Sequence, residues 1–600
     1  MLYLKNRKEG NIMMDRKLLI SKMEYLFRIL FIMVWLSNLA STDAYISVYV
    51  LISFAAFYCT FQEDKLNFII SKREYFIFLL VSLFFSLITL AANYSVFTKV
   101  RDPEFIQSST NLLVNVLNTL FSFIGGIVVA YPILKFSFCK MRDNKGFSGS
   151  SFDRKNYYFF CIVSFLFIFF VFIAHLFLVE YPGNVTEDPF TQISEMCTGV
   201  YSNFNTFWHT IFMQGIFSVG YFLFGNVNAA VALFCLVQAF IMAASFTYCL
   251  STLYLVGVPK IFLFCSFVIY AFLPYNIALS ITIWKDVLFA AGCLLMTCGI
   301  FRILYRLRDK QIWDYVITIL GSFLFALSRN NGWYVFFISL LIILWPLRKQ
   351  KWLVLSLVSV FAVCWLMTNP ILSLLGVSGN DYTEALSIPL QQVSRVIADG
   401  HELTDDETQL ISQVLDIDEV PDLYVNWLSD PIKVEFRSNN TDYFEENVGE
   451  YVRLWLTLGR KYPGSYFKAW VDQTKGYWNA GYGYGMYSET VTENPYGVAK
   501  AGRSNLIASL FRLYFGLSRH VIFFEPLHSI GLHVWITAIC CLFCAMLKRK
   551  EWILSVPLLV IVLGLCFGTP VYASFRYAYP VFVCFPLILG TTLFHTKTRK

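Results

Sequence analysis

Residues 154–188 read RKNYYFFCIVSFLFIFFVFIAHLFLVEYPGNVTED, and this stretch shows how the chain is organised. Two basic residues, Arg154 and Lys155, precede a long apolar run, and an acidic loop follows that run. A bilayer core needs roughly 20 apolar residues per helix, and basic flanking residues stay on the cytoplasmic side. The stretch therefore predicts a helix that crosses a membrane outward and ends in an extracytoplasmic loop at Glu180.

The composition of the whole chain supports a membrane protein. Hydrophobic residues make up 57% of the 600 residues and charged residues only 14%, whereas soluble domains carry about 25% charged residues. The 15 cysteines lie mostly inside apolar runs, and none occurs in the polar stretch 375–525. Their positions suggest small apolar side chains in helices, and their spacing suits neither a disulfide framework nor zinc.

Apolar runs of spanning length recur along the chain, and basic clusters lie between them. The runs are 25–41, 44–61, 75–93, 110–134, 157–179, 208–224, 227–250, 260–281, 283–305, 312–328, 332–346, 352–374, 527–547, 552–568 and 577–594. The basic clusters lie at the N-terminus up to Lys22, at 135–155, at 302–310, at 348–351, at 548–550 and at 597–600.

There are fifteen of these apolar runs, which is an odd number. If all of them crossed the membrane, the two ends of the chain would lie on opposite sides, so the basic clusters could not all be cytoplasmic. The run 208–224 resolves the conflict, because Thr210, Gln214, Ser218 and Tyr221 form a polar stripe at helical spacing. Such a helix can lie in the membrane interface without crossing it. The sequence therefore predicts an all-α membrane protein of about 14 transmembrane helices with both termini in the cytoplasm.

The same assignment of loops to the two sides of the membrane divides the chain into four predicted regions. Residues 1–155 form N-terminal transmembrane helices, and 156–374 form a transmembrane core with a first outer loop at 180–226. Residues 375–525 form a mainly helical extracytoplasmic domain, with 21 Asp and Glu against 12 Lys and Arg, and 526–600 form C-terminal transmembrane helices. Within the outer domain, Thr404 and Glu407 predict a capped helix over 403–415, and 476–485 is predicted to be a loop.

The first outer loop carries the candidate catalytic residues. It contains Glu187 and Asp188, and no Lys or Arg occurs between 156 and 259. With no cation nearby in sequence and with partial burial, the pKa of such a carboxylate is not depressed, so the group can accept a proton from a hydroxyl. Asp188 is therefore the candidate general base and Glu187 the second candidate, while Gln192 follows in the same loop as a candidate substrate-binding residue.

Three cations and one acid are predicted at the outer ends of membrane helices. Lys285 and Asp286 begin the run 283–305, Arg329 lies between two short apolar runs, and Arg576 begins the last span. Arginine binds phosphate oxygens through two parallel hydrogen bonds, so these cations could converge on an anionic headgroup that Asp286 helps to orient. His209, at the start of the interfacial run, is a weaker candidate for substrate binding.

Several other kinds of site are not indicated. The chain has no phosphate-binding Gly-x4-Gly-Lys-Ser/Thr loop and no Gly-x-Ser-x-Gly nucleophile turn. Glu187 and Asp188 are adjacent, which does not indicate a metal-bridging pair, and no basic aromatic patch indicates nucleic acid. We therefore expect neither a metal nor another cofactor.

The order of these motifs resembles that of the GT-C superfamily of membrane glycosyltransferases, and more narrowly a poorly characterised bacterial group within it. The motifs are Tyr181-Pro182-Gly183 with Asp188, Lys285-Asp286, Arg329-Asn330-Asn331-Gly332, Ile388-Pro389-Leu390-Gln391-Gln392-Val393-Ser394-Arg395, and Arg576-Tyr577 with Tyr579-Pro580. Relatives often carry His-Pro after the acidic loop, whereas here Thr210 follows His209.

The resemblance implies a GT-C-like fold and an inverting transfer of a hexosyl or pentosyl group in the cell membrane. The donor would be a polyprenyl-phosphate sugar and the acceptor an extracytoplasmic glycan or glycolipid. Asp188 would take the acceptor proton, and Lys285, Arg329 and Arg576 would stabilise the leaving phosphate. The sequence leaves open three other functions: a transporter or flippase of lipid-linked sugars, a polysaccharide polymerase or ligase of another fold, and a non-catalytic assembly factor.

Overall fold

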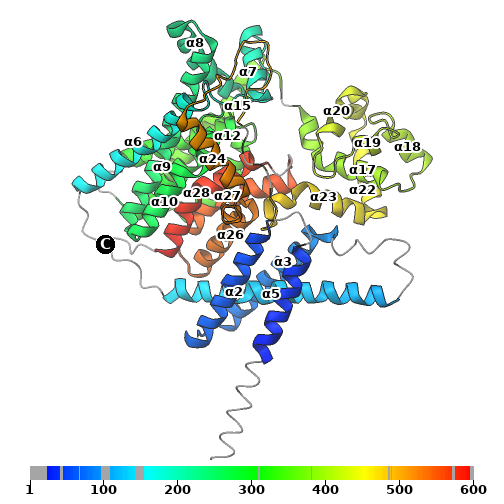
Figure 1. Cartoon of the computed structure of the whole chain (residues 1–600). Coiled ribbons are helices and arrows are strands. Elements are labelled where there is room, and N and C mark those ends of the chain that lie inside the picture. Colours follow the sequence, from blue (N-terminus) through cyan, green and yellow to red (C-terminus); the bar gives the residue numbers. More distant parts are fainter. Residues whose placement is uncertain are drawn as a thin grey trace, which may run out of the picture. The chain divides into compact units, whose positions relative to one another are not determined.

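The computed structural model describes residues 23–40, 45–66, 68–95, 109–143, 154–307, 311–379, 381–483, 485, 487, 489–570 and 574–594 (Figure 1). Both termini lie outside these residues, so their predicted cytoplasmic location has no structural counterpart here. The same holds for the basic residues up to Lys22, for Lys145, Arg308 and Lys310, and for the basic residues at 597–600.

The described residues form helices joined by short loops, and they contain no strand beyond four isolated β-bridges. Nine of the helices found there are long and apolar enough to cross a membrane. A tenth span is complete if α10 (Lys260–Phe272) and α11 (Pro274–Ser280), which meet at a 48° bend, count together. The chain is therefore an all-α, multi-pass membrane protein.

The predicted count of 14 spans is not reached within the part of the chain that the structure describes. Four predicted spans form helices of only 16 or 17 residues: α13 (Ile312–Leu327), α14 (Gly332–Leu347), α26 (Ile530–Met546) and α27 (Trp552–Phe567). A fifth, 25–41, is described as helical only over 23–39. Four of these five runs, 25–41, 312–328, 332–346 and 552–568, hold only 15–17 residues, at or below the lower end of the spanning range, so counting every run overestimates the number of full-length spanning helices.

The contacts divide the chain into two units. Unit 1 comprises 1–144, 479–483 and 525–532, and unit 2 comprises 145–478, 484–524 and 533–600. The long segment of unit 1 lies within the first predicted region, 1–155. By their contacts, two short segments also belong to unit 1. They are 479–483, near the end of the predicted outer domain, and 525–532, which begins at its last residue.

Unit 1 consists of the helix over 23–39, α2 (Ile46–Leu66), α3 (Lys72–Ala92), α5 (Ser109–Asp143) and α25 (Glu525–His528). Ser71 and Glu74 cap the start of α3, each side chain bonding the other's backbone N–H, which satisfies otherwise unpaired donors. Within this unit, the Tyr49 hydroxyl donates to Asn479 Oδ1 over 2.7 Å, so residues far apart in sequence meet.

Unit 2 begins with α6 (Arg154–Leu178), α7 (Glu187–Thr198), α8 (Phe207–Phe224) and α9 (Val227–Val256). After α10 and α11 follow α12 (Lys285–Tyr305), α13, α14, α15 (Lys351–Thr368) and the short α16 (Pro370–Leu374). The chain then forms a group of short helices and α24 (Leu506–His520), and it ends with α26, α27 and α28 (Phe575–Leu593).

Small residues allow α12 and α13 to pack closely. A Cβ atom on Gly292 would lie 2.5 Å from the backbone nitrogen of Phe325, and one on Gly321 would lie 2.7 Å from that of Met296. Close backbone approach through small residues is a common way to join helices within a membrane. Because the two helices form a hairpin, the start of α12 and the end of α13 meet at the same end of unit 2.

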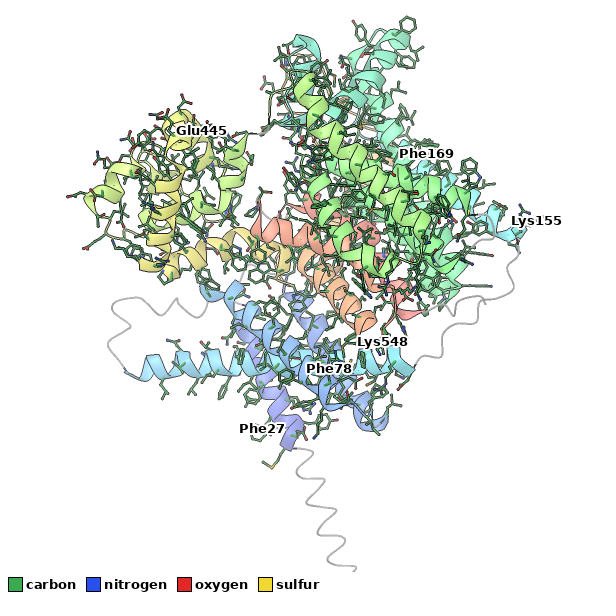
Figure 2. All side chains as sticks on the ribbon, turned by 180° about the vertical axis from the view of Figure 1, so that it is seen from behind. Phe27, Phe78, Lys155, Phe169, Glu445 and Lys548 are labelled. Carbon is green, nitrogen blue, oxygen red and sulfur yellow. The ribbon has the colours of Figure 1, made fainter. Side chains whose placement is uncertain are left out.

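The ends of the helices in unit 2 differ in charge. One set of ends carries Arg154 and Lys155 at the start of α6, the basic turn between α14 and α15, and Lys548 between α26 and α27. Figure 2 shows Lys155 at the start of α6 and Phe169 farther along the same helix. The opposite ends carry the loop after α6, the start of α12, the turn between α13 and α14, and the start of α28. By the rule that basic ends stay inside, we expect the second set of ends to face outward.

The predicted interfacial helix, 208–224, forms α8. Its length and composition make it one of the nine candidate spans, so these properties do not exclude crossing. However, Met213 and Phe217 pack on Ala230 to Cys235 of α9, and Gln238, farther along α9, already bonds the backbone just before α12. The part of α9 that contacts α8 therefore extends past the level at which α12 begins. Figure 1 shows α7 and α8 close together at one end of unit 2.

A group of short helices forms most of the predicted outer domain. It comprises the 3₁₀ helix Tyr382–Leu386 and α17 (Ser387–Ala398), α18 (Asp405–Ile411), α19 (Val420–Leu423), α20 (Asp430–Ser438), α21 (Thr441–Glu446), α22 (Val448–Lys461) and α23 (Pro463–Trp478). Val396, Ile432, Phe436 and Leu458 are among the buried residues of its core, and Figure 2 shows Glu445 on its surface.

Two local predictions for this region are partly confirmed. Thr404 and Glu407 form the predicted capping box at the start of α18, but the helix ends at Ile411 and not at 415. The predicted loop over 476–485 begins only after Trp478, because α23 continues to that residue.

Candidate functional site

The loop after α6 is held beside the segment that leads into α12. Asn184 exchanges backbone hydrogen bonds with Ile281 and Ile283, each over 3.0 Å, and Val185 bonds Thr490 and Thr492 in the same way. Gly183 has a φ of +123°, and a Cβ there would lie 2.4 Å from Cys235 Sγ. Only glycine fits this position without rearrangement, and the loop therefore reaches α7 next to the start of α12.

The first functional pair joins two residues that are 388 positions apart in sequence. Asp188, in the first turn of α7, accepts a hydrogen bond from Arg576 Nη1 over 2.8 Å, and Arg576 lies in the first turn of α28. The Asp188 side chain is 34% exposed and the Arg576 side chain 20% exposed. This pair, which we call the outer pair, can therefore be reached by a ligand.

A second pair lies deeper in the same cluster. Arg329 Nη1 is 2.9 Å from Asp286 Oδ1, and the Asp286 side chain is only 1% exposed. Breaking a buried ion pair by removing one partner typically costs about 3–5 kcal/mol. This inner pair therefore fixes the turn between α13 and α14 against the start of α12, and Asp286 orients Arg329.

Aromatic rings separate and orient the two arginines. The Arg576 guanidinium lies 5.2 Å from the Trp284 ring centre and donates to the Tyr577 hydroxyl over 2.7 Å. The Arg329 guanidinium lies 4.3 Å from the Tyr577 ring. Trp284 is itself fixed by a 2.8 Å hydrogen bond to Thr186 Oγ1. Cation–π contacts of this kind hold planar guanidinium groups in fixed orientations.

Lys285 is the cation of the cluster that has no direct ion pair among the described residues. Its Nζ donates to Asn205 Oδ1 over 3.0 Å, and Asn205 Nδ2 lies 3.4 Å from the backbone oxygen of Asp188. With two carboxylates and three cations, the cluster carries one more positive than negative charge. An anion that binds beside Lys285 would therefore compensate a charge that the protein itself leaves unmatched.

Gln192 and His209 lie behind this cluster and not in it. Both side chains are buried, and the Gln192 amide nitrogen lies 3.2 Å from the Asn205 backbone oxygen, 3.0 Å from His209 Nδ1 and 2.8 Å from Thr210 Oγ1. Their predicted role in substrate binding stays a prediction. They position the loop that carries Asn205, whose next residue, Thr206, adopts a φ of +70°.

The structure contradicts one premise of the sequence argument for Asp188. We expected a carboxylate with no cation nearby, but Asp188 lies among Arg576, Lys285 and Arg329. Burial raises the pKa of Asp188, yet these three cations outweigh burial and hold the pKa below its ordinary value. While the outer pair is intact, Asp188 is thus a weaker base than the sequence implied. Glu187, the second candidate, is exposed.

Sequence reasoning missed Asn205 altogether, assigned no role to Trp284, and named Tyr577 and Asn330 only as members of motifs. Asn330 receives a hydrogen bond from Thr206 Oγ1 over 2.7 Å and donates to the Phe204 oxygen over 2.7 Å, so it ties the Asn205 loop to the inner pair. No residue pattern around Asn205 signals this role. Among the described residues, no group of three or more His, Cys, Asp or Glu side chains could hold a metal ion.

These features define a multi-pass membrane protein with a positively charged, aromatic-lined cluster at one end of its helix bundle. The chain belongs to a family of unknown function (DUF6020), which it matches over residues 195–600. That range includes Lys285, Arg329 and Arg576 and begins just after Asp188. No curated protein matches the chain, and no solved structure does so either.

Proposed function

We propose that this protein is a membrane glycosyltransferase that moves a sugar from a polyprenyl-phosphate donor to an extracytoplasmic glycan or glycolipid. The observation that carries the proposal is the accessible Asp188–Arg576 pair beside Lys285. A carboxylate, a guanidinium and an ammonium group at one point supply a base and two phosphate ligands. The order of motifs that resembles the GT-C superfamily supports the same function.

The donor phosphate would bind between Arg576 and Lys285. Arg576 presents a planar fork to two phosphate oxygens, while Lys285 acts as a point charge. Because Arg576 neutralises Asp188 in the outer pair, a phosphate that takes over the guanidinium removes part of the stabilisation of the ionised carboxylate. The pKa of Asp188 then rises, so donor binding turns Asp188 into a stronger base.

The transfer is a single displacement. An acceptor hydroxyl attacks the anomeric carbon, its proton passes to a carboxylate oxygen of Asp188, and the bond from the anomeric carbon to the phosphate oxygen breaks. The electron pair of that bond leaves with the polyprenyl phosphate, and the anomeric configuration inverts. Arg576 and Lys285 stabilise the additional charge on the departing phosphate, with Arg329 behind them.

The position of the cluster favours a donor that is carried by a lipid. The cluster lies at the ends of apolar helices, where a polyprenyl chain can remain in the bilayer while its phosphate reaches the cations. By the positive-inside rule these ends face outward, where the short-helix group can recognise the acceptor. We place the protein in the cell membrane on this basis.

A transporter or flippase of lipid-linked sugars would need charges along its path through the membrane. Among the described residues of unit 2, the ion pair with both side chains fully buried is Arg302–Asp314, which lies toward the basic ends of α12 and α13. Tyr248 and Thr252 are further partners of its members. That pair joins helices and does not mark a path.

An assay in detergent distinguishes chemistry from transport, because detergent solution has no second leaflet. Purified protein is incubated with each of a panel of polyprenyl-phosphate hexoses and pentoses and with candidate glycan or glycolipid acceptors. We expect one donor to yield free polyprenyl phosphate and a glycosylated acceptor in equal amounts. If no donor is converted in detergent while a labelled donor crosses the bilayer of proteoliposomes, the protein is a flippase and the proposal fails.

A further inference from the structure

Unit 1 contains a cavity that the proposed function does not use. It has a volume of about 200 Å³ and lies between the helix over 23–39, α3 and α5, and it is lined by Arg28, Tyr75, Leu79, Ile127, Val128, Tyr131 and Pro132. One cation and two tyrosines thus accompany four apolar side chains. The mixture suits a ligand with an anionic group and an apolar chain.

The cavity lies toward one end of the unit. Tyr75 is in the first turn of α3, and Arg28 reaches Thr60 Oγ1, near the end of α2, over 3.4 Å. The same end carries Lys72, Arg73 and Lys140, none of which has an ion pair with a described carboxylate. Basic pockets between membrane helices at such an end bind the headgroups of anionic lipids.

Arg28 is available to such a ligand although it has an internal partner. Its Nη2 bonds Glu24 Oε1 over 2.7 Å, but the Glu24 side chain is 61% exposed and the Arg28 side chain 33% exposed. An ion pair this exposed contributes at most about 1 kcal/mol, so a phosphate can displace the carboxylate. The nearby acids Glu63 and Glu74 already pair with Lys135 and Arg142 and do not oppose an anion at Arg28.

We propose that this cavity binds an anionic phospholipid from the leaflet at the basic end of unit 1. Arg28 binds the phosphate, the hydroxyls of Tyr75 and Tyr131 lie beside the headgroup, and Leu79, Ile127 and Val128 contact the acyl chain. The site lies outside the residues that match the family. It does not depend on the proposed transfer reaction.

The test is a titration of purified full-length protein in neutral detergent, followed by thermal unfolding. The probes are dioctanoyl phosphatidylglycerol, dioctanoyl phosphatidylcholine and inorganic phosphate. Phosphatidylglycerol should stabilise the protein at lower concentration than phosphatidylcholine, and phosphate should not compete at equal concentration. Arg28→Met should weaken phosphatidylglycerol binding about fivefold, which corresponds to roughly 1 kcal/mol per basic side chain.

Two further variants make the result specific. Arg73→Met removes the same charge at the same end but does not line the cavity, so it should bind like the wild type. Val128→Trp fills the cavity while Arg28 remains, and it should also weaken binding, which provides a result if Arg28→Met does not fold. Equal affinity for both lipids, displacement by phosphate alone, or unchanged binding in both cavity variants would overturn the proposal.

Discussion

Replacing Asp188 with Asn should reduce the rate of sugar transfer by about 10²–10⁴-fold, the usual effect of losing a positioned general base. The amide keeps the size of the carboxylate but cannot accept the acceptor proton. Arg576 retains its hydrogen bond to Tyr577 and its contact with Trp284, so we expect the protein to fold and to bind donor. The measurement is the initial rate of transfer together with donor binding.

Glu187→Gln is the matched control. It removes a neighbouring and exposed carboxylate from the same turn of α7, so it changes the net charge by the same amount without touching the outer pair. Its rate should stay close to that of the wild type. The opposite pattern would exchange the two roles, and near-normal rates for both variants would remove the main support for a glycosyltransferase.

Arg576→Ala should weaken donor binding by about tenfold or more and also lower the transfer rate. A charge-assisted hydrogen bond contributes about 1.5–3 kcal/mol, and about 1.4 kcal/mol corresponds to a factor of ten in affinity. Arg576→Lys should restore binding only in part, because an ammonium group cannot form the two parallel bonds of the guanidinium. Binding of a labelled donor lipid to purified variants measures both effects.

Arg503→Ala is the control for the loss of an arginine in unit 2. Arg503 is exposed, its guanidinium lies 5.6 Å from the Tyr181 ring, and it is not a member of the outer pair. Donor affinity should not change in this variant. If Arg503→Ala and Arg576→Ala weakened binding equally, the effect would come from the overall charge of this end and not from a phosphate site.

The convergence of Asp188, Lys285, Arg329 and Arg576 could be predicted because each lies at the end of an apolar run. In a bundle of antiparallel helices, alternate ends meet at one side of the membrane, so residues at equivalent ends are brought together. Which residues pair could not be predicted. Asp188 and Arg576 are 388 positions apart, and only the packing of α12 against α28 and the loop after α6 sets the pairing.

The burial of two polar residues, Gln192 and His209, could not be predicted from the sequence either. Gln192 and His209 follow a charged loop and look like substrate contacts, but both side chains are buried, and the Gln192 amide nitrogen lies within hydrogen-bond distance of the Asn205 backbone oxygen and of His209 Nδ1. The count of spans was too high for a different reason. The runs 312–328 and 332–346 were counted as full spans although they hold only 17 and 15 residues, and the helices α13 and α14 are correspondingly short.

In the proposed mechanism, the donor phosphate takes the place of Asp188 as the partner of Arg576. A cryo-EM structure of the protein bound to a polyprenyl-phosphonate sugar, in which a methylene group replaces the glycosidic oxygen and prevents turnover, tests it most directly. We predict that the phosphonate lies within hydrogen-bond distance of Arg576 and Lys285, with Asp188 released and facing the anomeric carbon. A phosphonate bound elsewhere, with the Asp188–Arg576 pair intact, would contradict the account.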